Sequence, residues 1–169
     1  DQMKEQFPNL MTSRDDVKDI DIIAGTHPHQ TFEGRFLQWV KISDNPNTNE
    51  DEPEILYTAI HHAREPGSLQ QLIFYMWYIL ENYESDQEIR DIVDNTELYF
   101  IPCVNPDGYI YNETIEPEGG GMWRKNKFNS HGVDNNRNYS YIDPNGDEVW
   151  DTAGTSNNTG NDTYPGTEP

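Results

Sequence analysis

His62 and Glu65 have the residue types and the spacing of a metal site. They lie three positions apart in the segment HHARE, so in a helical turn an imidazole and a carboxylate can meet at one ion. A histidine and carboxylate pair suits zinc, and catalytic zinc sites usually have three protein ligands and a water. The spacing H-x-x-E also arises by chance, and Glu65 may be read simply as an acid at a helix N-terminus. Spacing alone leaves both interpretations open.

The elements around this pair place it at the end of a strand. The apolar run 54–60 has strand length, and residues 66–83 have apolar side chains at helical spacing on nearly all sides. Such a helix is expected to be buried. A further strand is expected at 97–104, so the order strand, helices, strand predicts a parallel crossover. Ligands of open α/β sheets bind at the carboxyl ends of the strands. His62 and Glu65 directly follow the carboxyl end of the predicted strand 54–60.

The remaining elements are less regular. The runs 19–24 and 36–42 predict neighbouring antiparallel strands, and Ser85 with Glu88 forms a capping-box pattern that predicts a helix start. No helix start precedes the apolar residues of the first twelve positions, and residues 105–169 show little periodicity. The expected fold class is α/β, with a mixed parallel and antiparallel sheet flanked by helices.

Composition excludes several functions. The 169 residues include 31 Asp and Glu and 11 Lys and Arg, which give a formal net charge of −20. Such an acidic chain should not bind nucleic acid or anionic membranes. No apolar run is long enough to span a bilayer, and no signal peptide is visible. The single cysteine, Cys103, excludes an internal disulfide framework and a four-cysteine zinc site.

Three further segments identify a family. They are NPDG at 105–108, WRKN at 123–126 and GVDNNRNY at 132–139. In this order and spacing, together with HHARE, they resemble the zinc carboxypeptidases of the carboxypeptidase A and B family. The segments KISDN, EDEPE and LYTAIHHARE are most similar to the bacterial carboxypeptidase T subgroup. The resemblance runs from about residue 7 to the end of the sequence and implies the zinc carboxypeptidase fold.

The resemblance also implies roles for single residues. His62 and Glu65 would be zinc ligands, and Asp134 would accept a hydrogen bond from His62 and fix its tautomer. Arg124 would polarise the scissile carbonyl and stabilise the oxyanion. Asn136 and Arg137 would bind the free C-terminal carboxylate of a peptide, and Arg64 would line the next subsite outward. Without the family, each arginine would be read as half of an exposed ion pair.

The other histidines have no predicted metal role. His61 should face away from the ligand beside it, and His27, His29 and His131 are expected to be solvated loop residues.

Part of the family's machinery is not found in residues 1–169. A third zinc ligand, a glutamate general base and a tyrosine that closes over the substrate cannot be assigned to any position. The expectation is therefore that residues 1–169 form the N-terminal part of one catalytic domain and are inactive alone. The predicted function is a zinc-dependent peptidase that releases C-terminal residues by metal-activated water. The alternatives are a peptide-carboxylate-binding module without activity and a family member that cuts peptidoglycan peptides. By family analogy the protein is expected to be monomeric, and secreted or periplasmic.

The acidic loop 43–54 predicts a second ion. Oxygen ligands crowd this segment and suit calcium, and the resemblance to the T subgroup associates the segment with calcium binding. The candidate ligands are Ser43, Asp44, Glu50, Glu52 and Glu54. A second run of alternating acids from Asp143 to Asp151 does not follow the EF-hand order, so a solvated turn is expected there.

Overall fold

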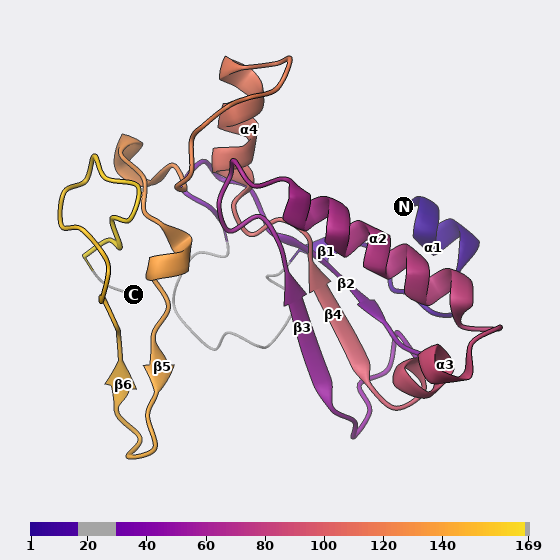
Figure 1. Ribbon diagram of the computed structural model, residues 1–169. Helices are drawn as coiled ribbons and strands as arrows, with labels where there is room; N and C mark the ends of the chain where they lie inside the picture. The colour runs from indigo at the N-terminus through magenta and orange to yellow at the C-terminus, as the bar shows by residue number, and fades with distance from the viewer. Residues whose placement is uncertain (17–29, 168–169) are drawn as a thin grey trace. The chain divides into compact units, whose positions relative to one another are not determined.

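The computed structural model describes residues 1–16 and 30–167 (Figure 1). The chain divides into two compact units. The first comprises residues 1–29, 36–59 and 67–104, and the second comprises residues 30–35, 60–66 and 105–169. The predicted strand 19–24, together with His27 and His29, lies outside the described residues.

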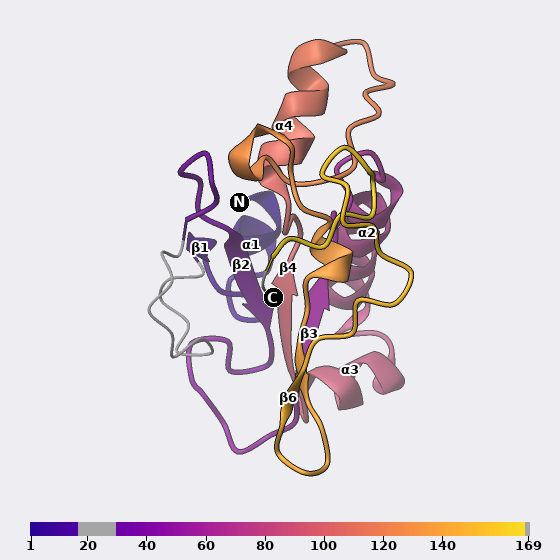
Figure 2. The same ribbon diagram turned by 90° about the vertical axis from the view of Figure 1, so that its left-hand side faces the viewer.

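The first unit contains a four-stranded sheet, and its mixed parallel and antiparallel pairing confirms the prediction from the sequence. Its order is β1 (Asp15–Asp16), β2 (Gln38–Ile42), β4 (Glu97–Ile101) and β3 (Glu54–Thr58), which Figure 2 shows from left to right. β2 pairs antiparallel with β1 and β4, whereas β3 and β4 are parallel. The parallel pair needs a long crossover, and the chain between the two strands supplies two helices.

These crossover helices are α2 (Gly67–Asn82) and α3 (Gln87–Val93), and both lie on the same side of the sheet (Figure 1). Tyr75 of α2 contacts Tyr57 of β3, with ring centroids 5.3 Å apart, and also packs near Phe100 of β4. The side chains beneath the helices are almost fully buried and form the core of this unit: Val40, Ile42, Leu98, Phe100, Met76, Ile79, Leu80 and Val93.

Two expectations for these helices are wrong in part. Helix α2 is not buried all round, because Phe74 is 70% exposed and Tyr78 is 42% exposed on its outer side. Helix α3 begins one residue later than the capping-box pattern indicates. Asp86 is the N-cap and accepts hydrogen bonds from the amides of Glu88 and Ile89, while the Ser85 hydroxyl donates to the Asn82 carbonyl. An ionised aspartate accepts these bonds better than a hydroxyl.

The N-terminal residues form a helix that the sequence pattern does not indicate. The N-cap residue of helix α1 (Gln2–Gln6) is Asp1, a residue type that favours helix starts, but its side chain forms no capping hydrogen bond. The helix buries Met3, and the ring of Phe7, just past its end, meets Trp77 of α2 edge to face at 6.2 Å. Tertiary contacts therefore stabilise a helix too short to form alone.

The opposite face of the sheet contains a buried ion pair. Lys41 of β2 and Glu97 of β4 lie 2.7 Å apart, with side chains 4% and 0% exposed. Glu97 also accepts hydrogen bonds from the Glu50 amide and the Tyr99 hydroxyl. Burial alone would raise the pKa of Glu97, but these bonds and the charge of Lys41 hold the pKa below its ordinary value.

The second unit contains a helix that the sequence did not predict, because residues 105–169 show little periodicity. Helix α4 (Pro106–Ile115) begins at Asn105, whose side chain accepts a hydrogen bond from the Gly108 amide, and has Pro106 in its first turn. An Asn N-cap followed by proline is a known start signal that could have been read. Gly108 is needed here, since a Cβ atom would lie 2.5 Å from the Lys125 carbonyl oxygen and 2.8 Å from Ala63.

The rest of this unit is loop, with short regular pieces. These are the 3-10 helices η2 (Phe128–Ser130) and η3 (Asn135–Arg137) and a hairpin of β5 (Tyr141–Ile142) with β6 (Glu148–Val149). In the hairpin turn, Asp143 accepts hydrogen bonds from the amides of Asn145 and Asp147. The acidic run 143–151 thus begins with a turn, as expected. No helix in the described parts of the chain is long and apolar enough to cross a membrane.

Candidate active site

His62 lies in the loop 60–66 of the second unit, and this loop is fixed by its neighbours. The Ala63 amide donates to the Arg124 carbonyl at 2.9 Å, and the Asn105 side chain donates to the His61 carbonyl at 3.1 Å. Ile60, which is 1% exposed, has a positive φ of 53°, an uncommon conformation for a β-branched residue. The loop therefore has one defined path, even at some backbone cost.

The two candidate metal ligands converge as their spacing predicts. The Glu65 amide donates to the His62 carbonyl at 3.1 Å, which closes a tight turn between them. His62 Nδ1 then lies 3.0 Å from Glu65 Oε2. The side chain of Glu65 is 54% exposed and that of His62 is 9% exposed, so the carboxylate lies on the open side of the pair.

Asp134 occupies the other side of the imidazole ring. Its fully buried carboxylate lies 3.0 Å from His62 Nε2. The same carboxylate accepts hydrogen bonds from Nε and Nη2 of Arg124, at 3.2 and 2.9 Å, and from the Asn136 amide at 3.0 Å. With Nε2 engaged by Asp134, Nδ1 is the ring nitrogen that faces Glu65. In the tautomer that donates from Nε2 to Asp134, neutral His62 would offer the lone pair of Nδ1 to a metal ion.

Arg124 links the two carboxylates. Besides its bonds to Asp134, its Nη1 lies 3.4 Å from Glu65 Oε1, and its side chain is 13% exposed. The sequence resemblance predicts that this arginine stabilises an oxyanion. The structure brings the guanidinium beside one candidate ligand, Glu65, although its nitrogens are already paired with the carboxylates of Glu65 and Asp134.

The predicted carboxylate-binding residues follow Asp134 directly. Asp134 caps the short helix η3, which contains Asn136 and Arg137. Asn136 is exposed and Arg137 is half-buried, with its Nη1 donating to the Asn136 carbonyl at 2.8 Å. Because the cap is also the residue that holds His62, one side chain positions both the imidazole and the predicted clamp.

Two of the remaining histidines are not simply solvated. His61 Nε2 lies 2.9 Å from the Tyr139 hydroxyl, and burial followed by the charge of His62 lowers the pKa of His61. His131 packs edge to face on Tyr164, with centroids 5.4 Å apart. The expectation of a simply solvated loop histidine is therefore wrong for His131, which is partly buried.

Sequence reasoning missed several residues that support the site. Lys125, which is 4% exposed, donates to the Thr159 and Asn161 carbonyls, and burial lowers its pKa. Asp162 forms an ion pair with Arg64. Lys125 could have been noticed within the motif WRKN, but nothing near Asp162 in the sequence indicates its partner.

Known proteins share sequence and fold with this chain. Residues 19–169 match the family model for zinc carboxypeptidases. The chain belongs to the zinc carboxypeptidase family. Curated relatives include a zinc carboxypeptidase of Saccharothrix mutabilis subsp. capreolus, 32% identical over 81% of this chain and 35% of its own length. A metallocarboxypeptidase A of Trichophyton tonsurans is 32% identical over 83% of this chain and 32% of its length.

Solved structures of carboxypeptidases have the same fold. Carboxypeptidase A from Helicoverpa armigera superposes with a TM-score of 0.71 at 24% identity, covering 99% of this chain and 36% of that one. Thrombin-activatable fibrinolysis inhibitor gives 0.73 at 24% identity, covering 99% and 37%. This chain spans about a third of the length of the curated zinc carboxypeptidases that it matches.

The residues present fit the zinc that the family name implies. Nδ1 of His62 and Oε2 of Glu65 lie 3.0 Å apart, and Asp134 is held at the other ring nitrogen. Two ligands held about 2.0–2.2 Å from one zinc at a tetrahedral angle lie roughly 3.3 Å apart. One nitrogen and one oxygen donor, with a carboxylate fixing the ring, are a suitable partial zinc site.

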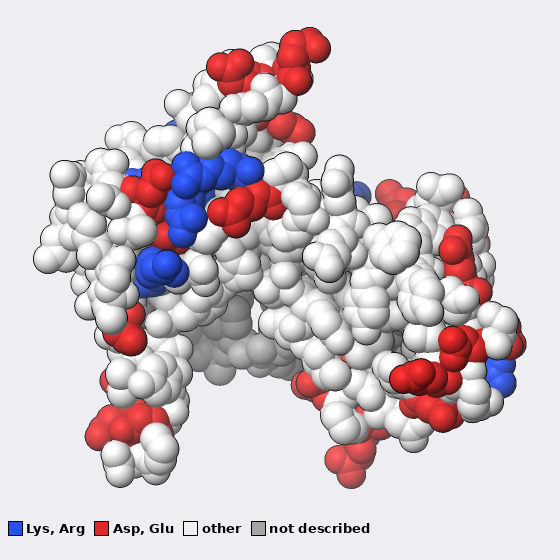
Figure 3. Space-filling view, in the orientation of Figure 1, with Lys and Arg blue, Asp and Glu red and all other residues white. Residues whose placement is uncertain are grey.

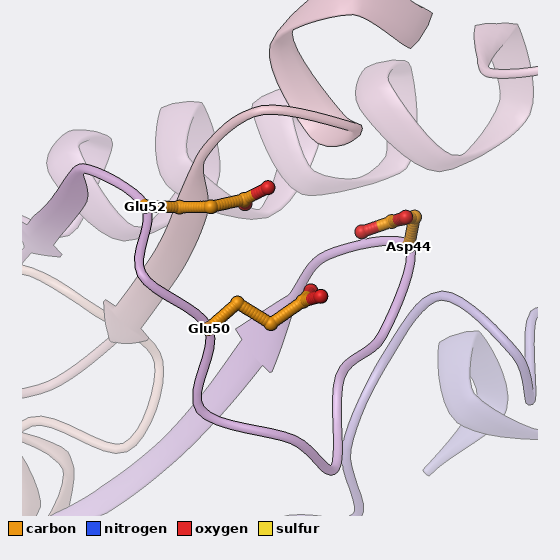
Figure 4. A group of neighbouring side chains, drawn as sticks. All are labelled: Asp44, Glu50 and Glu52. Carbon is orange, nitrogen blue, oxygen red and sulfur yellow. The ribbon is translucent and has the colours of Figure 1, made fainter.

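The acidic loop of the first unit contains a second group of ligand atoms. Carboxylate oxygens of Asp44, Glu50 and Glu52 lie within 4.8 Å of one another, and Figure 4 shows the three side chains pointing into the space within the loop. Ser43 is fully buried, and its hydroxyl accepts a hydrogen bond from the Asn45 amide. Glu54 lies outside this group of carboxylates. The structure thus brings together three of the five predicted ligands.

Proposed function

We propose that this chain supplies the metal-binding and carboxylate-binding part of a zinc-dependent peptidase that releases C-terminal amino acids from peptides. The observation that supports this proposal most strongly is the buried carboxylate of Asp134. It holds His62 on one oxygen and Arg124 on the other, and it caps the helix that contains Asn136 and Arg137. Metal ligand, oxyanion stabiliser and carboxylate clamp would thereby be oriented by one side chain.

Each residue has a separate task in this proposal. His62 and Glu65 would hold zinc, which when bound supplies a Lewis acid and lowers the pKa of water. Arg124 would donate hydrogen bonds to the carbonyl oxygen as negative charge develops there. Asn136 and Arg137 would bind the terminal carboxylate of the peptide, and Arg64 would line the neighbouring subsite.

The remaining catalytic groups are proposed to come from residues outside 1–169. They are a third zinc ligand, a glutamate general base that takes a proton from water, and a tyrosine that covers the substrate. Residues 1–169 alone would therefore bind zinc weakly and hydrolyse nothing. We also propose a relationship to the carboxypeptidase T subgroup, based on the segments KISDN, EDEPE and LYTAIHHARE.

The test combines composition with turnover. Intact mass and zinc content of the purified natural protein are measured first, followed by its activity on a peptide and on the same peptide with an amidated C-terminus. A protein larger than 19.6 kDa with about one zinc, which cleaves the free peptide only, is expected. Binding of the free peptide without turnover, in a zinc-free protein, would favour the carboxylate-binding module. Cleavage of both peptides equally would refute the carboxypeptidase proposal.

We further propose that the acidic loop binds calcium. Glu50 Oε2 and Glu52 Oε2 are buried and have no hydrogen-bond partner, which favours a bound cation. Burial raises the pKa of Glu52 most, and the negative charge of Glu50 is the second largest cause. Calcium should raise the thermal midpoint relative to chelator, Glu52→Gln should abolish this gain, and Asp51→Asn in the same loop should retain it. An equal midpoint with and without calcium would exclude the site.

The expected surroundings follow from the proposed activity. The substrate would be a peptide or protein with a free C-terminus, and a monomeric, secreted or periplasmic enzyme would meet such substrates. The formal charge of −20 argues against nucleic acid as a partner.

A further inference from the structure

Arg64 is already paired in the structure. Its Nη2 lies 3.0 Å from Oδ2 of Asp162, and its Nη1 donates to the Met122 carbonyl at 3.2 Å. The Arg64 side chain is 26% exposed and that of Asp162 is 54% exposed, so a ligand can reach both. A substrate that approaches Arg64 therefore meets a neutral ion pair rather than a free positive charge.

The loop that carries Asp162 is held on both sides. Before it, the buried ammonium of Lys125 donates to the carbonyls of Thr159 and Asn161, at 2.7 and 2.9 Å. After it, the Tyr164 carbonyl accepts a hydrogen bond from the Asp134 amide at 2.8 Å. The backbone on both sides of Asp162 is thus held by buried contacts, one of them to the residue that holds His62.

Asp162 of this pair lines an open pocket of about 540 Å³, whereas Arg64 does not. The other charged residues of the lining are Glu116, Arg124 and Lys125. The pocket is large enough for one or two amino-acid side chains. Figure 3 shows basic side chains gathered among acidic ones on this face, close to helix α4. The lining includes neither Asn136 nor Arg137. The lining does include Arg124, the proposed oxyanion donor, so the pocket lies beyond the scissile carbonyl for a peptide whose carboxylate is bound at those two residues. Side chains N-terminal to the scissile bond would then be the ones that reach it.

We infer that Asp162 is a specificity-determining residue that disfavours acidic side chains on the N-terminal side of the scissile bond. This inference rests on the proposed function. An acidic side chain entering the pocket would approach the Asp162 carboxylate and would have to compete with it for Arg64. A neutral or basic side chain meets no such penalty. Without the Asp162 charge, Arg64 would keep one carbonyl acceptor and gain a positive charge available to substrate.

The test uses the complete zinc-loaded enzyme that contains this chain, and two peptides that differ only in Glu or Gln upstream of the same C-terminal residue. In Asp162→Asn the ratio of kcat/KM for the Glu peptide over the Gln peptide should rise about three- to tenfold, the range expected for one partly exposed charge. The control Glu118→Gln removes an equal charge outside the pocket lining and should change the ratio less than about twofold. Thermal midpoints should agree among the three proteins.

A third variant tests whether the gain depends on the unpaired Arg64 or only on the loss of one negative charge. In the double variant Arg64→Gln/Asp162→Asn the gain for the Glu peptide should disappear, because no unpaired guanidinium remains. An unchanged ratio in Asp162→Asn, or a gain that persists in the double variant, would overturn the inference while leaving the peptidase assignment intact. A parent enzyme that cleaves neither peptide nor any other free C-terminus would overturn the proposed function, and this inference with it.

Discussion

Replacing Asp134 by asparagine tests the central network most directly. The exchange keeps the size of the side chain but removes its charge and one of its two acceptor oxygens. The carboxylate now accepts four N–H groups, two on each oxygen, from His62, Asn136 and Arg124. An amide has a single acceptor oxygen, so whichever way it turns, two of these donors would face an NH₂ group.

The magnitude follows from burial. Asp134 is fully buried and the Arg124 side chain is only 13% exposed. Breaking a buried pair by removing one partner costs about 3–5 kcal/mol. Glu65, 3.4 Å from Nη1 of Arg124, can compensate in part, so a loss near the lower end, about 3 kcal/mol, is expected. Loss of the hydrogen bond that orients His62 should weaken zinc binding about 10- to 100-fold.

Two measurements check this expectation. Denaturant unfolding of Asp134→Asn gives the change in stability, and competition with a chelator at pH 7 gives the change in zinc affinity. Asp162→Asn is the matched control, because it makes the same exchange at a 54% exposed carboxylate with one ion-pair partner. It should cost less than about 1 kcal/mol and leave zinc affinity unchanged. Equal zinc affinity in Asp134→Asn and the parent would refute the argument that Asp134 orients the ligand.

Four further variants probe the first unit. Lys41→Met should cost about 3–5 kcal/mol at neutral pH by leaving Glu97 buried without its cation, and the cost should shrink in acid as Glu97 becomes protonated. Because the pKa of Glu97 is lowered in the folded protein, ionised Glu97 stabilises the fold above about pH 4. This stabilisation is lost as pH falls through the folded pKa. Asp86→Ala should cost about 1 kcal/mol through the lost cap of α3, whereas Ser85→Ala should cost little. Glu52→Gln should stabilise the protein in chelator at neutral pH, because the raised pKa of Glu52 makes its ionised form unfavourable in the folded protein. This gain should shrink as pH falls through the folded pKa and vanish below the ordinary pKa of glutamate.

Each of these outcomes has a direct check. Denaturant unfolding from pH 3 to pH 8 follows Lys41→Met, and the double variant Lys41→Met/Glu97→Leu should regain most of the lost stability. If the double variant is as unstable as the single one, the unpaired charge is not the cause. Equal stability of Asp86→Ala and Ser85→Ala would contradict the observed cap. A chelator-treated Glu52→Gln protein less stable than the parent would show that Glu52 is not strained by its neighbours.

The secondary structure was predictable where local pattern was strong. The strand, helix and strand of residues 54–101 follow from apolar periodicity, and their parallel pairing follows from the length of the crossover. Helix α4 was missed because its ten residues bury mainly polar and small side chains, so it has no apolar stripe. The exposure of Phe74 on α2 was also not predictable. The sequence shows where the apolar side chains lie around a helix, but not which of them other elements cover.

The candidate ligands His62 and Glu65 were visible in the sequence because they lie three positions apart. A tight turn brings residues at this spacing together without help from other segments. Their family roles followed from resemblance to known motifs. Only the tertiary structure decided that Asp134, 72 positions after His62, contacts Nε2 of the imidazole ring. The same is true of the ion pair between Asp162 and Arg64. Spacing determines contacts within a turn, whereas contacts across such separations depend on the folding of every segment between them.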